Sequence, residues 1–275
     1  MSPKTLQIIS ATLFSTLYFP CGSQGALADL TDTISSSESI LFSDDFNDNS
    51  NNWSDIGTST GEATIGQDPG GTGQTVYYPS NAGDGSETLS SINLGVSSPD
   101  LSNGTINAYM RVRVDANAAN DRFYIGLSES GSAYFNNLLI IPSSTSQVIY
   151  RKDDGSQTVD NGNTPSINYP DTSTYLNFKI SLTATDSDTT TITAFQYDGS
   201  TYVSILDAPI TNGGYDTGIF DTLTIQSRNA EIGDTNSRSF FDALAVTQTP
   251  IPEPSAYALI ISLGAITPIL LRRRR

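Results

Sequence analysis

The chain has 275 residues, a formal net charge of −16 and 37% apolar residues, so it is long and apolar enough to bury a substantial core. Residues 29–250 hold 28 of the 29 acidic residues but only 8 of the 13 basic ones, which gives this body a formal charge of −20. Such a body repels phosphate backbones and anionic lipid heads, so we expect no nucleic-acid partner, and cations are the natural counterparts.

Two residue types that carry much enzyme chemistry are missing from the body. The sequence has no histidine, and its one cysteine, Cys21, lies in a segment that we expect to be removed. This excludes Ser-His-Asp and Cys-His catalysis, zinc sites made of His or Cys, and disulfides within the mature chain. Any metal site must use oxygen ligands, which suits calcium.

The first 28 residues have the layout of a secretory signal peptide. Lys4 precedes an apolar stretch from Leu6 to Phe19, and small residues follow at Ala26 and Ala28. We expect export through the Sec translocon and cleavage after Ala28, with an amphipathic or buried helix as the alternative. Residues 29–39, DLTDTISSSES, are polar and rich in Ser and Thr, so we expect a flexible lead-in.

Short apolar or alternating runs, separated by Gly, Asn, Asp and Ser clusters, fill residues 40–248. The expected strands are 39–46, 62–66, 75–79, 88–95, 105–115, 122–128, 133–141, 147–152, 175–185, 189–197, 201–207, 220–228 and 239–248. From Ile106 to Val114 every second residue is apolar, and Arg111 and Arg113 lie on the opposite face, which is the period of a half-buried strand.

Many short strands without helical crossovers predict an all-β fold, an antiparallel β-sandwich over residues 40–248. Its size suits one large jelly roll. Two smaller tandem sandwiches, split near Pro165 to Pro170, stay open as an alternative.

The two ends of the body resemble the opening and closing strands of concanavalin A-like and laminin G-like domains. The residues that carry this resemblance are DDFND at 44–48, Trp53, and the final strand SFFDALAVT at 239–247. The resemblance implies a concanavalin A-like jelly roll in which the first and last strands pair in one sheet.

The acidic residues at these two ends are candidate calcium ligands. The candidates are Asp44, Asp45, Asp48 and Asp242. The segment is not an EF-hand, because Ser50 and Ile56 stand where that loop needs glycine and glutamate. A jelly-roll calcium site would form if the first and last strands are neighbours, and the alternative is that these aspartates cap turns and solvate strand ends.

The sequence shows no sign of glycosidase chemistry, which needs two carboxylates roughly 5 to 10 Å apart, one of them with a raised pKa. The E-x-D-x-x-E signature of glycosidases on this fold is absent, so we expect no enzyme, with an extracellular glycan hydrolase or lyase as the alternative. Sugar binding needs an aromatic platform instead. The candidates for this platform are tyrosines beside polar loops, namely Tyr77, Tyr78, Tyr134, Tyr197 and Tyr202. The alternative is that these rings fill the core or shield a sheet face.

The chain ends in a short apolar helix between a proline motif and a basic cluster. Its parts are the motif Pro252, Glu253 and Pro254, an expected membrane helix over 255–271, and the basic end Arg272, Arg273, Arg274 and Arg275. The apolar run 256–271 would span roughly 24 Å as a helix, short of a hydrocarbon core of about 30 Å. The arginines predict that the C-terminus stays cytoplasmic and the body lies outside.

This tail, residues 249–275, closely resembles the PEP-CTERM sorting tail of exported bacterial proteins in order, spacing and position. The resemblance implies cleavage near Pro252 to Pro254 by an exosortase after transient insertion in the inner membrane. The body would then be released or re-anchored at the surface of a Gram-negative bacterium that makes exopolysaccharide. We therefore expect a secreted or cell-surface protein whose body has a structural or carbohydrate-binding role in a biofilm matrix, with polysaccharide as its partner.

Overall fold

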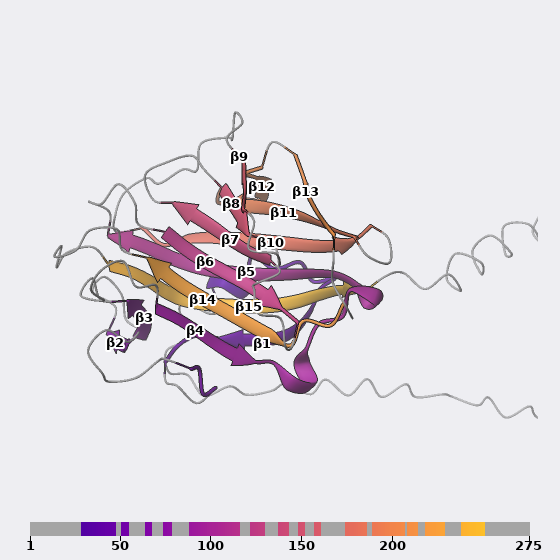
Figure 1. Cartoon of the computed structure of the whole chain (residues 1–275). Helices are drawn as coiled ribbons and strands as arrows, with labels where there is room; N and C mark the ends of the chain where they lie inside the picture. Colours follow the sequence, from indigo (N-terminus) through magenta and orange to yellow (C-terminus); the bar gives the residue numbers. More distant parts are fainter. Residues whose placement is uncertain are drawn as a thin grey trace, which may run out of the picture.

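The computed structural model describes residues 29–47, 51–54, 64–67, 74–78, 88–115, 122–129, 137–142, 148–151, 157–160, 174–185, 189–206, 208–213, 218–228 and 238–250. These residues form two antiparallel β-sheets that pack face to face (Figure 1). The expected all-β sandwich is thereby confirmed. Within the described ranges no helix is long and apolar enough to cross a bilayer, and the expected signal peptide and membrane helix lie outside them.

The strands follow one another along the whole body. They are β1 (Ser39–Asp44), β2 (Thr64–Gln67), β3 (Gln74–Tyr78), β4 (Thr88–Asn93), β5 (Gly104–Asp115), β6 (Arg122–Ser128), β7 (Asn137–Pro142), β8 (Val148–Arg151), β9 (Gln157–Asp160), β10 (Leu176–Ala184), β11 (Thr189–Tyr197), β12 (Tyr202–Ser204), β13 (Ile210–Gly213), β14 (Thr222–Arg228) and β15 (Arg238–Pro250). Two short 3-10 helices, η2 (Gly95–Ser97) and η3 (Leu101–Asn103), join β4 to β5.

Strands from both halves of the chain interleave in both sheets. The nine-stranded sheet has the order β12-β11-β10-β5-β15-β3-β2, with β1 added beside β15 and β13 beside β11. The six-stranded sheet has the order β4-β14-β6-β7-β8-β9. Because β5 pairs with β10 and β14 pairs with both β4 and β6, two tandem sandwiches split near Pro165 to Pro170 are incompatible with this topology.

The first and last strands pair, as the resemblance implied. β1 runs antiparallel to β15, from Ser39 opposite Gln248 to Asp44 opposite Leu244, with an irregularity between Ile40 and Phe42. β15 continues on its other edge against the full length of β5. The last strand, β15, therefore lies in the middle of the nine-stranded sheet, with β5 along one edge and β1 and β3 along the other.

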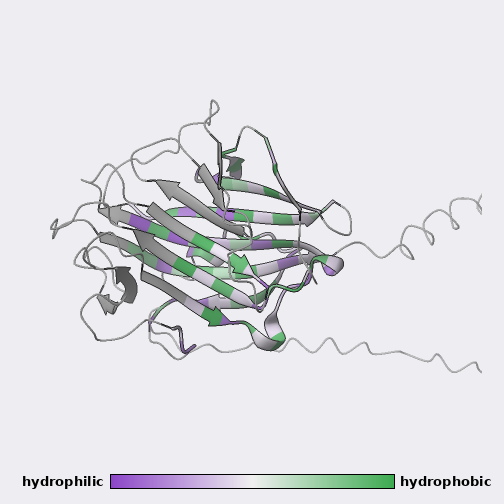
Figure 2. Cartoon of the chain, viewed as in Figure 1, coloured by the Kyte–Doolittle hydropathy of each residue, from purple (hydrophilic) through white to green (hydrophobic). Residues whose placement is uncertain are grey.

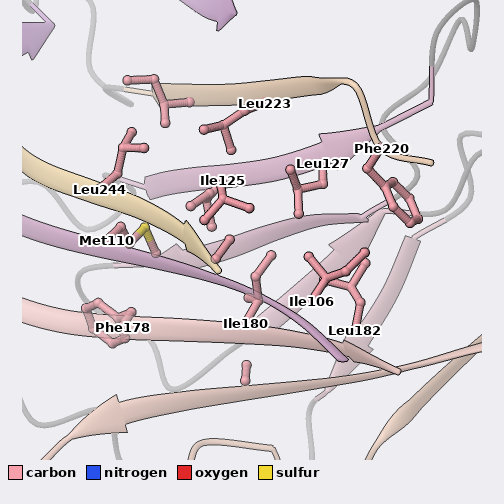
Figure 3. Close-up of a cluster of buried hydrophobic side chains, with 14 of the residues drawn as sticks. Ile106, Met110, Ile125, Leu127, Phe178, Ile180, Leu182, Phe220, Leu223 and Leu244 are labelled. Atoms are coloured by element: carbon pink, nitrogen blue, oxygen red, sulfur yellow. The ribbon is translucent and has the colours of Figure 1, made fainter. Parts of the chain in front are cut away.

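The core lies between the sheets and follows from the alternation of the strands (Figure 2). From the nine-stranded sheet, Met110, Phe178 and Ile180 point inward, and from the six-stranded sheet Ile125 and Leu223 meet them (Figure 3). All five are at most 1% exposed. Each such side chain contributes about 1.5–3 kcal/mol of burial free energy, before the entropy cost of ordering the chain.

The polar segment before β1 corrects one expectation. Residues 29–39 were predicted to be a flexible lead-in, yet residues 29–31 are helical and Leu30 is fully buried. Backbone bonds from Thr33 N to the Leu30 carbonyl and from Ile34 N to the Thr31 carbonyl, both 3.0 Å, shape this turn. We call residues 29–38 the N-terminal strap, because they lie against the outward face of the nine-stranded sheet.

Candidate functional site

The outward face of the nine-stranded sheet is polar and aromatic. It is formed by the residues that alternate with the core positions of β5, β10, β11 and β15. They include Asn107, Tyr109, Arg111, Asn177, Lys179, Ser181, Phe195, Tyr197, Ala243 and Ala245. A face of this composition can hydrogen bond to a polar ligand and also offer rings for stacking, which an ordinary solvated sheet face does not combine.

One leucine packs the strap onto this face. Leu30 forms a small apolar cluster with Tyr109, Ala243 and Ala245, and Ile34 packs against it. The two alanines leave the space that the leucine fills. A second core therefore lies outside the sandwich, between the strap and β5 and β15.

A glutamate at the end of the strap binds polar side chains of two strands, β5 and β15. The Glu38 carboxylate accepts hydrogen bonds from Tyr109 OH at 2.8 Å, from Asn107 Nδ2 at 2.9 Å and from the Thr247 hydroxyl. Asn107 in turn accepts a hydrogen bond from the Ser181 hydroxyl. Hydrogen bonds to a charged acceptor are worth about 1.5–3 kcal/mol each, so this network holds the strap in place.

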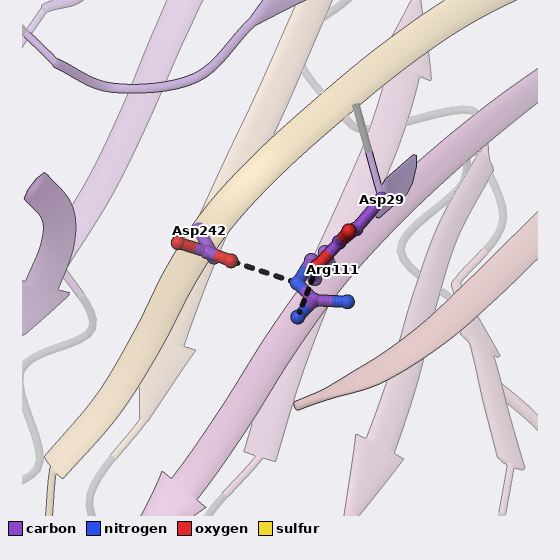
Figure 4. Close-up of polar contacts among 3 residues, drawn as sticks. All are labelled: Asp29, Arg111 and Asp242. Carbon is purple, nitrogen blue, oxygen red and sulfur yellow. Dashed lines mark hydrogen bonds and ion pairs between the residues drawn. The ribbon is translucent and has the colours of Figure 1, made fainter. Parts of the chain in front are cut away.

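At the start of the strap, Arg111 bridges two carboxylates (Figure 4). Its Nε donates to Asp242 Oδ2 at 2.8 Å, and its NH2 group lies 3.1 Å from Asp29 Oδ2. Asp242 is buried, whereas 58% of the Asp29 side chain is exposed. The guanidinium also lies over the Tyr175 ring, 5.2 Å from its centroid, which is a cation–π distance.

Next to this bridge, tyrosines and a lysine form a stacked cluster. The Lys179 ammonium lies 4.5 Å from the Phe195 ring centroid and 5.0 Å from that of Tyr202. The Tyr202 ring contacts both Tyr109 and Tyr197, at centroid distances of 5.4 and 5.2 Å. Burial lowers the pKa of Lys179. Burial also raises the pKa of Tyr109, helped by its hydrogen bond to Glu38 and that residue's charge. The pKa of Tyr202 is raised as well, first by burial.

A cavity of about 810 Å³ opens where the strap meets the start of β10, the end of β11 and β12. Its volume falls in the range of small-molecule sites, roughly 300–1,000 Å³. Its lining residues are Asp29, Asp32, Thr33, Arg111, Thr174, Tyr175, Leu176, Asn177, Gln196, Tyr197, Asp198, Gly199, Val203, Ser204 and Ile205. They come from four separate stretches of the chain, which only the fold brings together.

One amide in this lining has an unsatisfied acceptor. Asn177 is 8% exposed, and its Oδ1 has no hydrogen-bond partner among the residues that the structure describes. A buried acceptor without a donor costs about 1–3 kcal/mol, and because this oxygen is covered, a ligand hydroxyl or amine could pair with it only after the amide turns toward the cavity. Asn177 thus gives the cavity a specific polar feature.

Three carboxylates share the cavity with two tyrosines, but they are unequal. Asp29 is tied to Arg111. Asp198 is an exposed turn residue whose Oδ1 accepts hydrogen bonds from Thr201 N and Ser200 N at 2.8 Å and from Ser200 Oγ at 2.9 Å. These bonds, led by the one from Thr201, lower the pKa of Asp198, which is the opposite of what a general acid needs.

The four candidate calcium ligands fall in different environments. Asp44 Oδ1 accepts from Phe46 N at 2.7 Å, and its Oδ2 accepts from Asn51 Nδ2 at 2.8 Å and Trp53 Nε1 at 2.7 Å. Asp44 therefore caps a turn, which is the alternative that the sequence left open for these aspartates. The Trp53 ring packs on the Phe42 and Phe46 rings, so this segment plugs one end of the core.

The other three aspartates do not join Asp44. Asp242 is bound to Arg111 on the outward face, and Asp45 accepts from the backbone and side chain of Asn47. Asp48 lies outside the described residues. Within the described ranges no group of three or more acidic side chains is placed to hold a metal ion. Calcium binding therefore stays a prediction, and these residues give it no assembled site.

Of the five tyrosines that the sequence offered as a platform, Tyr197 lines the cavity and Tyr202 lies beside it in the aromatic cluster. The side chains of Tyr77, Tyr78 and Tyr134 lie outside the described part of the structure. So do the residues of the two targeting segments: Ala26, Ala28, Pro252, Glu253, Pro254 and Arg272 to Arg275. Sequence reasoning missed Tyr175, Asn177 and the strap, since no motif spaces them.

Comparison with known proteins shows the fold. No protein-family model matches the chain, and no curated protein sequence matches it. Among solved structures, the chain is similar to the Emp47p carbohydrate recognition domain, with 11% identity and a TM-score of 0.50 over 78% of this chain and 98% of that one. A xylan β-1,4-xylosidase from Bacillus halodurans C-125 aligns with 10% identity and a TM-score of 0.49, over 75% of this chain and 39% of that one. At such low identity the likeness to the Emp47p domain shows that the two chains share a β-sandwich fold.

Proposed function

We propose that this chain is an exported protein whose β-sandwich body binds carbohydrate in the cavity beneath the N-terminal strap. The single observation that carries the proposal is the lining of that cavity, where the rings of Tyr175 and Tyr197 accompany the Asn177 amide and several carboxylates. Sugars present apolar ring faces edged by hydroxyls, so they suit a site that combines aromatic rings with hydrogen-bonding groups. The fold shared with a carbohydrate recognition domain agrees with this proposal.

Binding is tested best with a glycan array probed by the full-length chain, purified in detergent, in the presence of calcium and of a chelator. We expect calcium-independent binding to a limited set of glycans. The variant Tyr197→Ala should remove a platform ring and lower affinity about tenfold, in line with alanine scans of aromatic anchors. Val96→Ala, at an exposed residue of η2 outside the cavity lining, is the control and should leave affinity nearly unchanged. Absence of any glycan binding would refute the proposal and leave a structural role.

Catalysis is the second candidate, because Asp29, Asp32 and Asp198 line one cavity with tyrosines. Binding without catalysis is favoured, since Asp29 is held by Arg111 and the pKa of Asp198 is lowered. A hydrolase or lyase needs one carboxyl group that keeps its proton at working pH. Incubation of array hits with the protein, followed by mass spectrometry of the glycans, decides between the two: shortened products would establish an enzyme.

We further propose the targeting route that the two ends of the sequence indicate. Signal peptidase would cut after Ala28, and an exosortase would recognise Pro252 to Pro254 while Arg272 to Arg275 hold the C-terminus in the cytoplasm of a Gram-negative cell. The body would then reach the cell surface or the exopolysaccharide matrix.

This route predicts a specific sorting defect. Changing Glu253 to alanine, or deleting Arg272 to Arg275, should leave the body folded but retained as an uncleaved inner-membrane form. Immunoblots of membrane and culture fractions measure the outcome. Normal release of both variants would show that the tail is not a sorting signal.

A further inference from the structure

The cavity beneath the strap offers a ligand many acceptors and few available cations. Asp29, Asp32 and Asp198 contribute three carboxylates to its lining, against the single guanidinium of Arg111. The surrounding body adds to this imbalance with its formal charge of −20 over residues 29–250. A concave site focuses the electric field of its charges, so this excess of negative charge acts on any ligand that enters the cavity.

Arg111, the one cation among the described lining residues, already pairs with two carboxylates. Arg111 holds Asp242 at 2.8 Å and Asp29 at 3.1 Å, and 20% of its side chain is exposed. Two carboxylates therefore already compensate the charge of Arg111 before any ligand arrives. Displacing the buried Asp242 would break the 2.8 Å hydrogen bond that it accepts from the Nε of Arg111, which is unfavourable for a buried pair.

Two further cations that the structure describes on the outward face are engaged as well. Arg113 is 4% exposed and lies over the rings of Tyr175 and Phe240, with 4.4 Å to the Phe240 centroid. Lys179 lies over three aromatic rings, and its pKa is lowered by burial. Neither side chain lines the cavity.

Two of the acidic side chains in the lining, in contrast, are accessible. Asp32 and Asp198 are both exposed, and the hydrogen bonds within its turn lower the pKa of Asp198. Among the described residues neither of them forms an ion pair with Arg or Lys. An exposed carboxylate at the mouth of a site interacts with a bound ammonium by up to about 1 kcal/mol.

A separate observation points to a ligand that donates hydrogen bonds. Asn177, 8% exposed, lines the cavity with an Oδ1 that lacks a partner among the described residues. Carboxylates and this amide oxygen are all acceptors, and an ammonium group is donor-only with three N–H bonds. The lining therefore matches a donor-rich, cationic ligand in hydrogen-bonding character as well as in charge.

Resting on the proposed function, we propose that the carbohydrate taken by this cavity is an amino sugar with a free, protonated amine, and that uronates and sulfated sugars are rejected. The amine would lie near Asp32 and Asp198, and the Asn177 amide would accept from a neighbouring hydroxyl. A uronate would face the same two carboxylates, and the guanidinium of Arg111 beside them already pairs with Asp29 and Asp242, which makes it the matched negative ligand.

The test measures calorimetric binding of three oligosaccharides of equal length to the full-length chain, at a pH where sugar amines are protonated. The probes are a chitosan hexamer, with free amines, its N-acetylated chitin counterpart, and an oligogalacturonate. We expect the chitosan hexamer to bind at least tenfold more tightly than the chitin hexamer and the oligogalacturonate not to bind. Salt should weaken the chitosan complex, because the charges are exposed.

Charge variants separate the site from the general acidity of the body. Asp32→Asn and Asp198→Asn should each weaken chitosan binding about two- to fivefold, the effect of one exposed ion pair. Asp221→Asn makes the same charge change at the start of β14 in the other sheet and should have no effect.

Three outcomes would overturn the inference. Equal weakening by Asp221→Asn would show that chitosan binds the acidic surface at large. Tight binding of the oligogalacturonate, or equal affinity for chitin and chitosan, would overturn the charge selectivity but leave carbohydrate binding standing. Failure of every glycan on the array would instead refute the proposed function itself.

Discussion

We expect one substitution, Glu38→Ala, to loosen the strap from the sheet. Its carboxylate accepts from Tyr109, Asn107 and Thr247, and Asn107 is only 3% exposed. Removal of the acceptor leaves the buried Asn107 amide short of a strong partner. Loss of one charge-assisted hydrogen bond costs about 1.5–3 kcal/mol, and the bonds of one network do not add, so we expect the free energy of unfolding to fall by about 2–4 kcal/mol.

Thermal unfolding followed by circular dichroism measures this loss. For a body of this size, 1 kcal/mol corresponds to about 2–4 °C, so the midpoint should fall by roughly 4–16 °C. Ser36→Ala is the control within the strap, because Ser36 is exposed, and it should change stability by less than about 0.5 kcal/mol. Hydrogen exchange at residues 30–38 should accelerate in the Glu38 variant alone, because local opening precedes global unfolding.

The same variant should also change the ionisation of Tyr109. The hydrogen bond and the charge of Glu38 both raise the pKa of Tyr109, after burial. Without Glu38 the Tyr109 phenol should ionise at a lower pH, which absorbance titration near 295 nm records. A variant that keeps wild-type stability and an unchanged tyrosine titration would refute the role assigned to Glu38.

Two further predictions concern the body. Gly104→Ala should destabilise the body by several kcal/mol in urea unfolding, because φ at Gly104 is +145° and a Cβ there would overlap a backbone carbonyl of β15. Gly199→Ala is the control for the overlap, since Gly199 also has a positive φ, +100°, but a Cβ there would meet open space. This control variant should cost far less. Stability should also fall above about pH 10, because folding raises the pKa values of Tyr109 and Tyr202. The unfolded state ionises first, near the ordinary tyrosine pKa of about 10. The contribution of the two tyrosines to the free energy of unfolding is therefore complete below that pH and is lost as the pH rises above it. Unfolding midpoints measured from neutral to alkaline pH should show this decline, and Tyr202→Phe should reduce it.

Strands with regular alternation could be predicted from the sequence because their side chains divide cleanly between two faces. The run from Ile106 to Val112 and the run from Leu176 to Leu182 became β5 and β10 with the expected inward residues. The short strands β9 and β13 were missed. Gln157–Asp160 and Ile210–Gly213 hold one apolar residue each, so their strand structure comes from pairing with β8 and β11 rather than from a pattern of their own.

The strap and the cavity could not be predicted from the sequence, for a related reason. DLTDTISSSES is polar enough for a loop, and what orders it is one leucine in a gap left by two alanines and one glutamate opposite three donors. Neither feature is periodic. The cavity likewise joins residues near positions 30, 111, 175 and 200, and only the register of β5, β10 and β11 places them side by side. The outward position of Arg111 could be read from alternation, but its carboxylate partners could not.

The strap connects the predicted export route to the proposed site. Cleavage after Ala28 would make Asp29 the first residue of the mature chain, and Asp29 already lines the cavity beside Arg111. The new α-ammonium would then stand at the mouth of the site. It would offset one carboxylate there and leave Asp32 and Asp198 as the groups that set the charge preference.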